Sequence, residues 1–232
     1  MTIKGVLFDF SGTLFRIEPA EAWLRATLAE TGLTLPETEL VRTARDLESA
    51  GAHPGSRHPA QPVPEHLTAL WEARDRSAGE HRAAFTGLSR QVPLPDPGLH
   101  DALYDRHMAP AAWTPYPDAA EVLGVLRERG FAVGVVSNIG WDLRPVFREH
   151  GLDPQVGTYV LSYEHGIEKP DPRLFAIACS ELGIAPEDTL MVGDDRRADG
   201  GAAALGCAVR FVDHLPVADR PDGLRPVLDA VL

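Results

Sequence analysis

The feature that most constrains the fold is a set of short apolar runs, rich in Val and Ile, that end in small or acidic residues. Near-continuous apolar runs of this length are typical of strands that are buried on both faces of a parallel sheet. Helical patterns separate the later runs, which favours an α/β fold with a Rossmann-like, doubly wound parallel sheet. The runs cover residues 5–10, 131–137, 158–162, 189–193 and 207–212.

Two helices between the later runs have recognisable starts. One apolar face is formed by Ala119, Val122, Leu123 and Leu126, and Asp118 is the predicted N-cap. A second helix is predicted to begin at Asp171-Pro172, an N-cap followed by proline at the first helical position.

The stretch between residues 17 and 113 interrupts this alternation, because it contains no convincing strand pattern. We therefore predict a core formed by residues 1–16 and 114–232, and an α-helical cap domain formed by residues 17–113. A Pro/Gly/His-rich segment, residues 52–64, is predicted to be an exposed loop. Ligands bind at the carboxyl ends of the strands in such sheets, so the inserted cap would cover that edge. The predicted cap helices are residues 20–31, 37–50, 64–78, 79–91 and 97–108.

Composition and charge exclude several classes of partner. The formal net charge of -12 argues against a nucleic-acid or anionic-membrane surface. Cys179 and Cys207 are the only cysteines, and they lack C-x-x-C spacing, so a reduced cytoplasmic location is expected. The N-terminal apolar run is too short to span a bilayer. Nothing in the sequence predicts the oligomeric state.

Polar residues follow four of the apolar runs. Asp9-Phe10-Ser11-Gly12-Thr13 closes the first run, and Ser137-Asn138 closes the second. Lys169 precedes the helix that begins at Asp171, and Asp194-Asp195 closes the fourth run, with Asp199 shortly after it. Carboxyl ends of parallel strands share one edge of a sheet, so these side chains are expected to meet there.

In this order the four motifs resemble those of the haloacid dehalogenase-like hydrolases, and the resemblance spans the whole chain. The family's nucleophile loop reads Asp-x-Asp-x-Thr, whereas this chain has Ser11 at the second Asp. The resemblance implies that Asp9 attacks phosphorus and forms an aspartyl-phosphate, while Thr13 orients the loop. It also implies a Mg²⁺ ion held by Asp9, the backbone carbonyl of Ser11 and Asp194.

The remaining motif residues have implied roles around the phosphoryl group. Lys169 would hold Asp9 and a phosphoryl oxygen as a point charge, and it is one of only two lysines in the chain. Ser137 and the amides near Asn138 would donate hydrogen bonds to phosphoryl oxygens. Asp199 would position Lys169 or metal-bound water, and Asp195 either belongs to the metal's surroundings or caps a helix.

Ser11 leaves the reaction type open. Within the family an Asp at this position protonates the leaving oxygen, and such general acid–base help is typically worth about 10²–10⁴-fold. The leading hypothesis is a phosphatase acting on a small phosphorylated metabolite. The alternatives are a metal-free 2-haloacid dehalogenase-like hydrolase and a catalytically weak protein that binds a phosphate ligand. No lysine lies between residues 5 and 168, so the cap cannot supply a Schiff base.

A replacement acid or a substrate contact could come from the cap. Trp71, Arg74, Asp75, His81 and Arg82 fall in one short stretch with helical spacing. Arg74 and Arg82 could clamp an anionic substrate, and His81 could supply a proton near neutral pH. Arg16 is another candidate anion contact. The alternative for all four is a polar surface on which arginine stems cover apolar neighbours.

Overall fold

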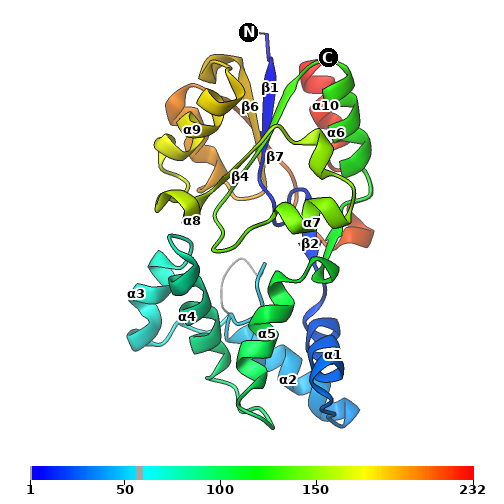
Figure 1. Ribbon diagram of the computed structural model, residues 1–232, viewed down its shortest axis with the longest axis vertical. Coiled ribbons are helices and arrows are strands. Elements are labelled where there is room, and N and C mark those ends of the chain that lie inside the picture. The colour runs from blue at the N-terminus through cyan, green and yellow to red at the C-terminus, as the bar shows by residue number, and fades with distance from the viewer. Residues whose placement is uncertain (1, 56–59) are drawn as a thin grey trace.

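The structure is a computed structural model that describes residues 2–55 and 60–232. It consists of a sheet-containing core and a helical cap, with both chain termini at the end of the core remote from the cap (Figure 1). Among the described residues, no helix combines the length and apolarity needed to cross a membrane.

The core contains a five-stranded, wholly parallel sheet, as predicted, in the order β5-β4-β1-β6-β7. The strands alternate their side chains between two buried layers. In β1, Val6 and Phe8 pack in one apolar cluster with Leu123 of helix α6, whereas Leu7 packs in another with Leu174 of helix α9. The strands are β1 (Gly5–Phe8), β4 (Ala132–Ser137), β5 (Thr158–Leu161), β6 (Thr189–Gly193) and β7 (Ala208–Phe211).

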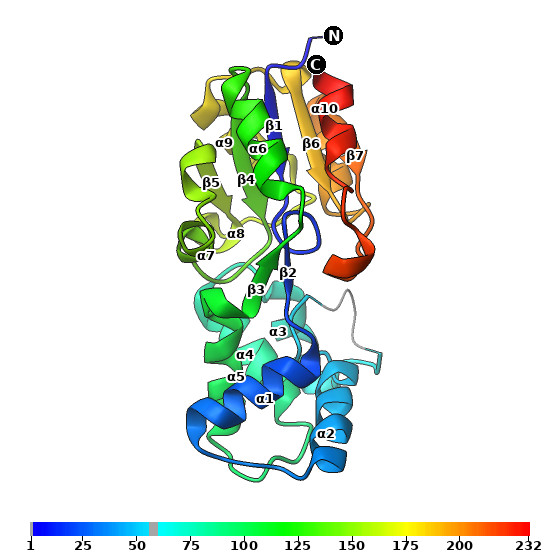
Figure 2. The same ribbon diagram turned by 90° about the vertical axis from the view of Figure 1, so that its right-hand side faces the viewer.

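Helices cover both faces of this sheet (Figures 1 and 2). Helices α6 (Ala119–Glu128), α7 (Arg144–Glu149) and α10 (Arg225–Val231) contribute to one layer, and α9 (Pro172–Leu182) contributes to the other. The short helix α8 (Ser162–His165) follows β5. The carboxyl ends of the strands face the cap (Figure 1).

Of the two residues predicted to cap helix N-termini, one does so and the other does not. Asp171 caps α9 as expected, because its side chain accepts a hydrogen bond from the backbone amide of Arg173 at 3.0 Å. Asp118 was expected to cap α6 but makes no such bond there. Its carboxylate instead accepts the amides of Leu224 (2.6 Å) and Arg225 (3.0 Å), and thereby ties the start of α10 to α6. The sequence identified Asp118 as a capping residue, but it could not show that the amides it binds belong to a helix far along the chain.

In the insert after β1, the described residues form five α-helices with an apolar core of their own, which includes Trp23, Leu47 and Leu103. The third predicted helix is too long at its C-terminal end. It stops at Ala73, and Ser77 begins a new helix by accepting the amide of Glu80 at 3.2 Å. The helices are α1 (Ala20–Thr31), α2 (Glu37–Ser49), α3 (Glu65–Ala73), α4 (Ala78–Ser89) and α5 (Leu99–Met108).

A short antiparallel ribbon joins core and cap, where β2 (Phe15–Ile17) pairs with β3 (Trp113–Pro115) (Figure 2). Strands of three residues are too short to show hydrophobic periodicity, which explains why neither strand was predicted.

The segment predicted as an exposed loop, residues 52–64, is buried where it begins. Ala52, His53 and Pro54 lie in the interior, so this part of the prediction is wrong. His53 places a ring nitrogen 2.9 Å from the carbonyl oxygen of Glu18, which ties the segment to the cap's entry. Residues 56–59 of the predicted loop lie outside the described residues.

Candidate active site

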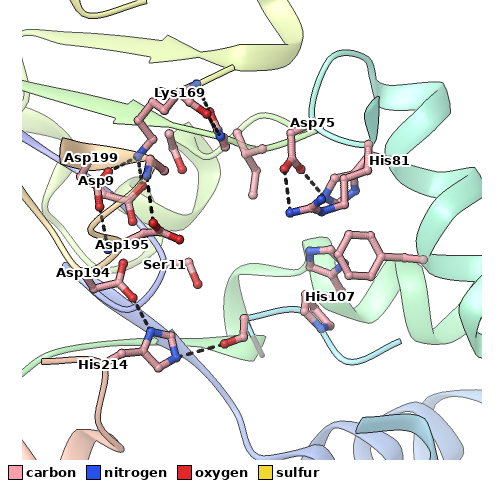
Figure 3. Close-up of a pocket in the computed structure, with 18 of the residues that line it drawn as sticks. Asp9, Ser11, Asp75, His81, His107, Lys169, Asp194, Asp195, Asp199 and His214 are labelled. Carbon is pink, nitrogen blue, oxygen red and sulfur yellow. Dashed lines mark hydrogen bonds and ion pairs between the residues drawn. The ribbon is translucent and has the colours of Figure 1, made fainter. Parts of the chain in front are cut away.

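A cavity of about 190 Å³ lies between the carboxyl ends of the strands and the cap (Figure 3). It brings together most of the predicted site residues, whereas Thr13, Arg16 and Arg82 are not part of its lining. The predicted residues that line it are Asp9, Ser11, Arg74, His81, Ser137, Asn138, Lys169, Asp194, Asp195 and Asp199.

The loop after β1 presents Asp9 to this cavity. The backbone amide of Asp9 donates to the carbonyl of Val192 on β6 at 2.9 Å, so the backbone that carries the Asp9 carboxylate is anchored to the sheet. Phe10 is fully buried, with its ring centroid 4.5 Å from that of Trp113. The chain then reverses at Gly12, whose φ of 82° favours glycine. A Cβ there would lie 2.2 Å from Nδ1 of His214 and 2.7 Å from Oδ2 of Asp194, so no side chain fits.

Lys169 connects two carboxylates inside the protein. Its ammonium nitrogen Nζ donates to Asp9 Oδ1 at 2.7 Å and to Asp199 Oδ1 at 2.6 Å, and its side chain is only 2% exposed. Burial opposes the charge, but Asp199 and Asp9 outweigh it and raise the pKa of Lys169 above its ordinary value. Lys169 is therefore a fixed positive charge beside the Asp9 carboxylate.

Asn138 positions Lys169 through the backbone. Its Oδ1 accepts the amide of Lys169 at 2.7 Å, and its Nδ2 donates to the carbonyl of Lys169 at 2.9 Å. The Asn138 side chain thus joins the end of β4 to the lysine loop, a role that the motif order alone did not suggest. Ser137, buried at the end of β4, lines the cavity beside it.

The Asp9 carboxylate has an unusual environment. Burial raises its pKa to about 7, Lys169 opposes this shift, and the neighbouring carboxylates of Asp199 and Asp194 add to it. Single oxygens of Asp9, Asp194 and Asp199 lie within 4.8 Å of one another. Lys169 binds two of these carboxylates, and the third, Asp194, contacts the ring of His214.

Asp199 and Asp195 both serve the loop after β6. Asp199 is fully buried, and its second oxygen accepts the amide of Asp195 at 2.9 Å. A Cβ on Gly193 would lie 2.0 Å from that same Asp199 oxygen, so glycine is needed there. Asp195 accepts the amides of Arg197 (2.8 Å) and Ala198 (2.9 Å) in the turn after β6. It does not cap the short helix that begins at Asp199, whose N-cap is Ala198 with no side-chain cap bond, so of the two alternatives that the sequence left open the helix cap is wrong.

His214, which the sequence reading missed, contacts Asp194. Its Nδ1 lies 2.5 Å from Asp194 Oδ2, and its Nε2 lies 3.1 Å from the carbonyl oxygen of Gly55. Arg16 donates to the same carbonyl at 2.9 Å and also contacts the His214 ring. Arg16 is therefore held away from the cavity lining, and His214 orients Asp194. The sequence could have identified His214 as a site residue, because it lies two residues beyond the fifth apolar run, which ends at the same edge of the sheet.

A second residue that sequence reasoning missed is Arg220. Its buried guanidinium donates to the carbonyl of Gly12 at 2.7 Å, to that of Asp213 at 2.8 Å and to that of Thr13. It thereby links the loop after β1 to the segment that carries His214. No pattern in the sequence identifies this arginine, because its partners are backbone carbonyls.

Two hydroxyls of the loop after β1 are buried without a hydrogen-bond partner among the described residues. They are Ser11 Oγ and Thr13 Oγ1. A buried hydroxyl with no protein partner is costly, so a ligand or ordered water is expected at Ser11, which lines the cavity.

The cap residues separate into two groups. Arg74 and His81 line the cavity, with the Arg74 guanidinium 4.0 Å from the centre of the Trp71 ring. Arg82 instead pairs with Asp101 (3.0 Å) and with Asp105 on the surface of the cap, so its predicted substrate contact is wrong. Arg82 follows His81 directly in the sequence, but consecutive residues of a helix face different directions, so only His81 faces the cavity.

His81 does not fit the predicted role of a proton donor that titrates near neutral pH. Its ring is buried, and Nδ1 bonds to the hydroxyl of Tyr104 at 2.8 Å. Burial, followed by the charge of Arg74, lowers the pKa of His81 to about 3. His81 is therefore a neutral ring in the wall of the cavity.

A sequence pattern described as haloacid dehalogenase-like hydrolase matches residues 3–206, which is most of the chain. The chain belongs to the haloacid dehalogenase-like hydrolase family. It is therefore a hydrolase, and the resemblance noted from its four motifs is confirmed.

Relatives in this family include both phosphatases and dehalogenases. The chain is 32% identical to glyceraldehyde 3-phosphate phosphatase of Methanopyrus kandleri over 202 residues, covering 83% of this chain and 76% of that protein. It is 27% identical to (S)-2-haloacid dehalogenase 4A of Burkholderia cepacia over 208 residues, covering 88% and 80%. It is 39% identical to phosphoserine phosphatase of Thermus thermophilus over only 113 residues, which are 48% of this chain and 42% of that protein.

Solved structures of the family share the fold. The magnesium-bound structure of an HAD hydrolase from Bacillus subtilis has a TM-score of 0.70, with 17% identity over 100% of this chain and 99% of that one. The parallel core sheet and the inserted helices are thus features common to these hydrolases. The family includes two chemistries, so the choice between them depends on the residues of the cavity.

Proposed function

We propose that this chain is a Mg²⁺-dependent hydrolase of small phosphate monoesters that works through an aspartyl-phosphate on Asp9. The observation that carries the proposal is the carboxylate cluster. Asp9, Asp194 and Asp199 bring three carboxylates within 4.8 Å of one another; Lys169 binds two of them and the ring of His214 contacts the third, so the negative charge exceeds the one fixed positive charge. A metal-free hydrolase gains nothing from this excess charge, whereas a divalent cation would stabilise it.

The donor set of the site fits Mg²⁺. Carboxylate and carbonyl oxygens are the ligands that this hard cation prefers, and Asp9, Asp194 and the Ser11 carbonyl would hold it. Both oxygens of Asp199 already accept hydrogen bonds from Lys169 and Asp195, so Asp199 would position the lysine. When bound, the cation would reduce repulsion between the anionic nucleophile and the anionic substrate.

The chain's own residues supply the rest of the chemistry. A carboxylate oxygen of Asp9 would attack phosphorus, and Lys169 would hold both Asp9 and a phosphoryl oxygen. Ser137 would donate its hydroxyl, and the backbone amides near Asn138 their N–H groups, to the other phosphoryl oxygens. Arg220 and the glycine turn would hold the nucleophile loop in one conformation, so that the attack distance stays fixed.

The test is a panel of small phosphate monoesters and 2-haloacids assayed with Mg²⁺ and with excess EDTA. We expect phosphate release with Mg²⁺, its loss in EDTA and its recovery when Mg²⁺ is returned. Asp194→Asn should lose both the activity and the Mg²⁺-induced rise in melting temperature, because it removes one charged ligand. Asp229→Asn, an exposed carboxylate on α10, is the matched control and should retain both.

Two other outcomes would contradict the proposal. Chloride release from a 2-haloacid in EDTA would identify the metal-free dehalogenase alternative. A melting temperature raised by inorganic phosphate, with no turnover of any ester, would identify a protein that only binds its ligand, the alternative that Ser11 suggests.

We further propose that Arg74 binds an anionic group of the substrate, since it is the arginine of the predicted set that lines the cavity. Arg74→Ala is expected to lower kcat/KM by about 10–100-fold, the value of one charge-assisted hydrogen bond. Arg82→Ala removes the same charge from the next helix, where it pairs with Asp101 and Asp105, and should leave kcat/KM within about twofold. Equal losses in both variants would point to general cap electrostatics instead.

A further inference from the structure

Hydrolysis of an alkyl phosphate needs a proton for the leaving oxygen, and Ser11 cannot supply it, because a serine hydroxyl is a very weak acid. The carboxyl groups on the core side of the cavity already have other tasks. Asp9 and Asp199 bind Lys169, Asp194 contacts His214, and Asp195 accepts two backbone amides. The cap side of the cavity contributes one more carboxyl group, Asp75.

The cap presents Asp75 at the turn between α3 and α4. The hydroxyl of Ser162, on the core, donates to the backbone carbonyl of Asp75 at 2.5 Å, so this turn is fixed to the core. The Asp75 side chain is 10% exposed and lines the same cavity as Asp9 and Ser11. Figure 3 shows its carboxylate on the cap side, opposite the core carboxylates, with His81 beside it.

The neighbours of the Asp75 carboxylate lie beyond ordinary hydrogen-bond length. Arg74 Nη2 is 3.5 Å from Oδ2, and His81 Nε2 is 3.6 Å from Oδ1. The carboxyl group therefore retains the capacity to exchange a proton with a molecule in the cavity.

The protonation of Asp75 suits such an exchange. Burial raises its pKa to about 6, while the charge of Arg74 opposes the shift. The other groups that face it are the neutral ring of His81 on α4, and Glu168 and Lys169 in the loop before α9. A carboxyl group in this range is partly protonated near neutral pH, as a general acid requires.

We propose that Asp75 is the general acid and base of this enzyme, and that it acts from the cap in place of the acid that the nucleophile loop lacks at Ser11. In the first step an oxygen of Asp9 bonds to phosphorus, the bond from phosphorus to the leaving oxygen breaks, and Asp75 gives its proton to that oxygen. In the second step water attacks phosphorus, Asp75 takes a proton from the water, and the bond from phosphorus to Asp9 breaks. This inference rests on the proposed phosphatase function.

The test compares esters whose leaving groups differ in basicity, with p-nitrophenyl phosphate at one end and a simple alkyl phosphate at the other. Asp75→Asn is expected to lower kcat/KM for the alkyl ester by about 10²–10⁴-fold, and to lower it at least about tenfold less for the aryl ester, whose leaving oxygen needs no proton. The quantity compared is kcat/KM because it reports the first step, in which Asp9 is phosphorylated, whereas kcat also includes the second step, which is the same for both esters. Glu72→Gln, an exposed carboxylate on the same helix–turn segment, is the matched control and should change neither value.

An equal loss of kcat/KM for both esters would overturn the inference, because it would mean that Asp75 binds or positions the substrate. The wild-type protein provides a second measurement that needs no variant. A general acid makes kcat/KM nearly independent of leaving-group basicity, whereas a steep decline of kcat/KM towards alkyl esters would also overturn the inference. If the wild type hydrolyses no ester, the proposed function fails, and this outcome is distinct from failure of the Asp75 assignment.

Discussion

Asp9→Asn is expected to abolish turnover while leaving the fold intact. An amide cannot attack phosphorus, so kcat should fall by about 10⁴–10⁶-fold. The side chain keeps its volume, and Lys169 keeps its 2.6 Å bond to Asp199, so the loss is confined to chemistry. Phosphate release under saturating ester, with circular dichroism to verify folding, is the measurement. Activity near the wild-type level would show that another group is the nucleophile.

The same variant is expected to change how the free energy of unfolding depends on pH. The pKa of Asp9 is raised from 3.8 to about 7 in the folded protein, so the folded state binds more protons than the unfolded state in this range. The stability of the wild type in EDTA should therefore fall as pH rises from about 4 to 7, and Asp9→Asn should lack this part of the fall. Urea unfolding at pH 5 and pH 8 measures the difference.

Lys169→Met is expected to have the second largest effect, on both stability and activity. Methionine fills the buried space but leaves Asp9 and Asp199 without their ammonium. Removing one partner of a buried ion pair typically costs about 3–5 kcal/mol of unfolding free energy. The loss of charge beside the nucleophile should also lower kcat by about 10²–10³-fold.

The pH dependence separates this charge effect from a packing effect. Without Lys169 the pKa values of Asp9 and Asp199 should rise further, so Lys169→Met should regain stability as pH falls and these carboxyls become neutral. Lys169→Arg, which keeps the positive charge, is the control and should be less destabilised at pH 8. If Lys169→Met is as stable as the wild type at pH 8, the buried ion pairs do not stabilise the fold.

Much of the fold was predictable because strands that are buried on both faces of a sheet appear in the sequence as nearly continuous apolar runs. The five apolar runs predicted the five strands of the sheet, and the run at residues 189–193 matches β6 residue for residue. The strand-end residues Asp9, Lys169 and Asp194 were predictable as a group, since parallel strands end at one edge. Their assigned roles in catalysis remain the predictions made above.

The errors arose where a side chain's partner lies far away in sequence. Asp118 was assigned to the nearer helix, although its carboxylate binds amides more than 100 residues away. Arg82 was grouped with Arg74 by spacing, although it faces Asp101 on the cap surface. The segment that begins at Ala52 has the composition of an exposed loop, yet its first residues are buried against the chain that leads into the cap.

By itself the sequence determined the fold class, the presence of a helical insert and the edge at which the polar motifs gather, because these depend on hydrophobic periodicity and on strand direction. Only the tertiary structure decided how the charges of the site are paired. It placed Lys169 between Asp9 and Asp199, brought His214 to Asp194, and set Asp75 of the cap across the cavity from Ser11. Electrostatic energies depend on distance and burial, and neither quantity is encoded in local sequence.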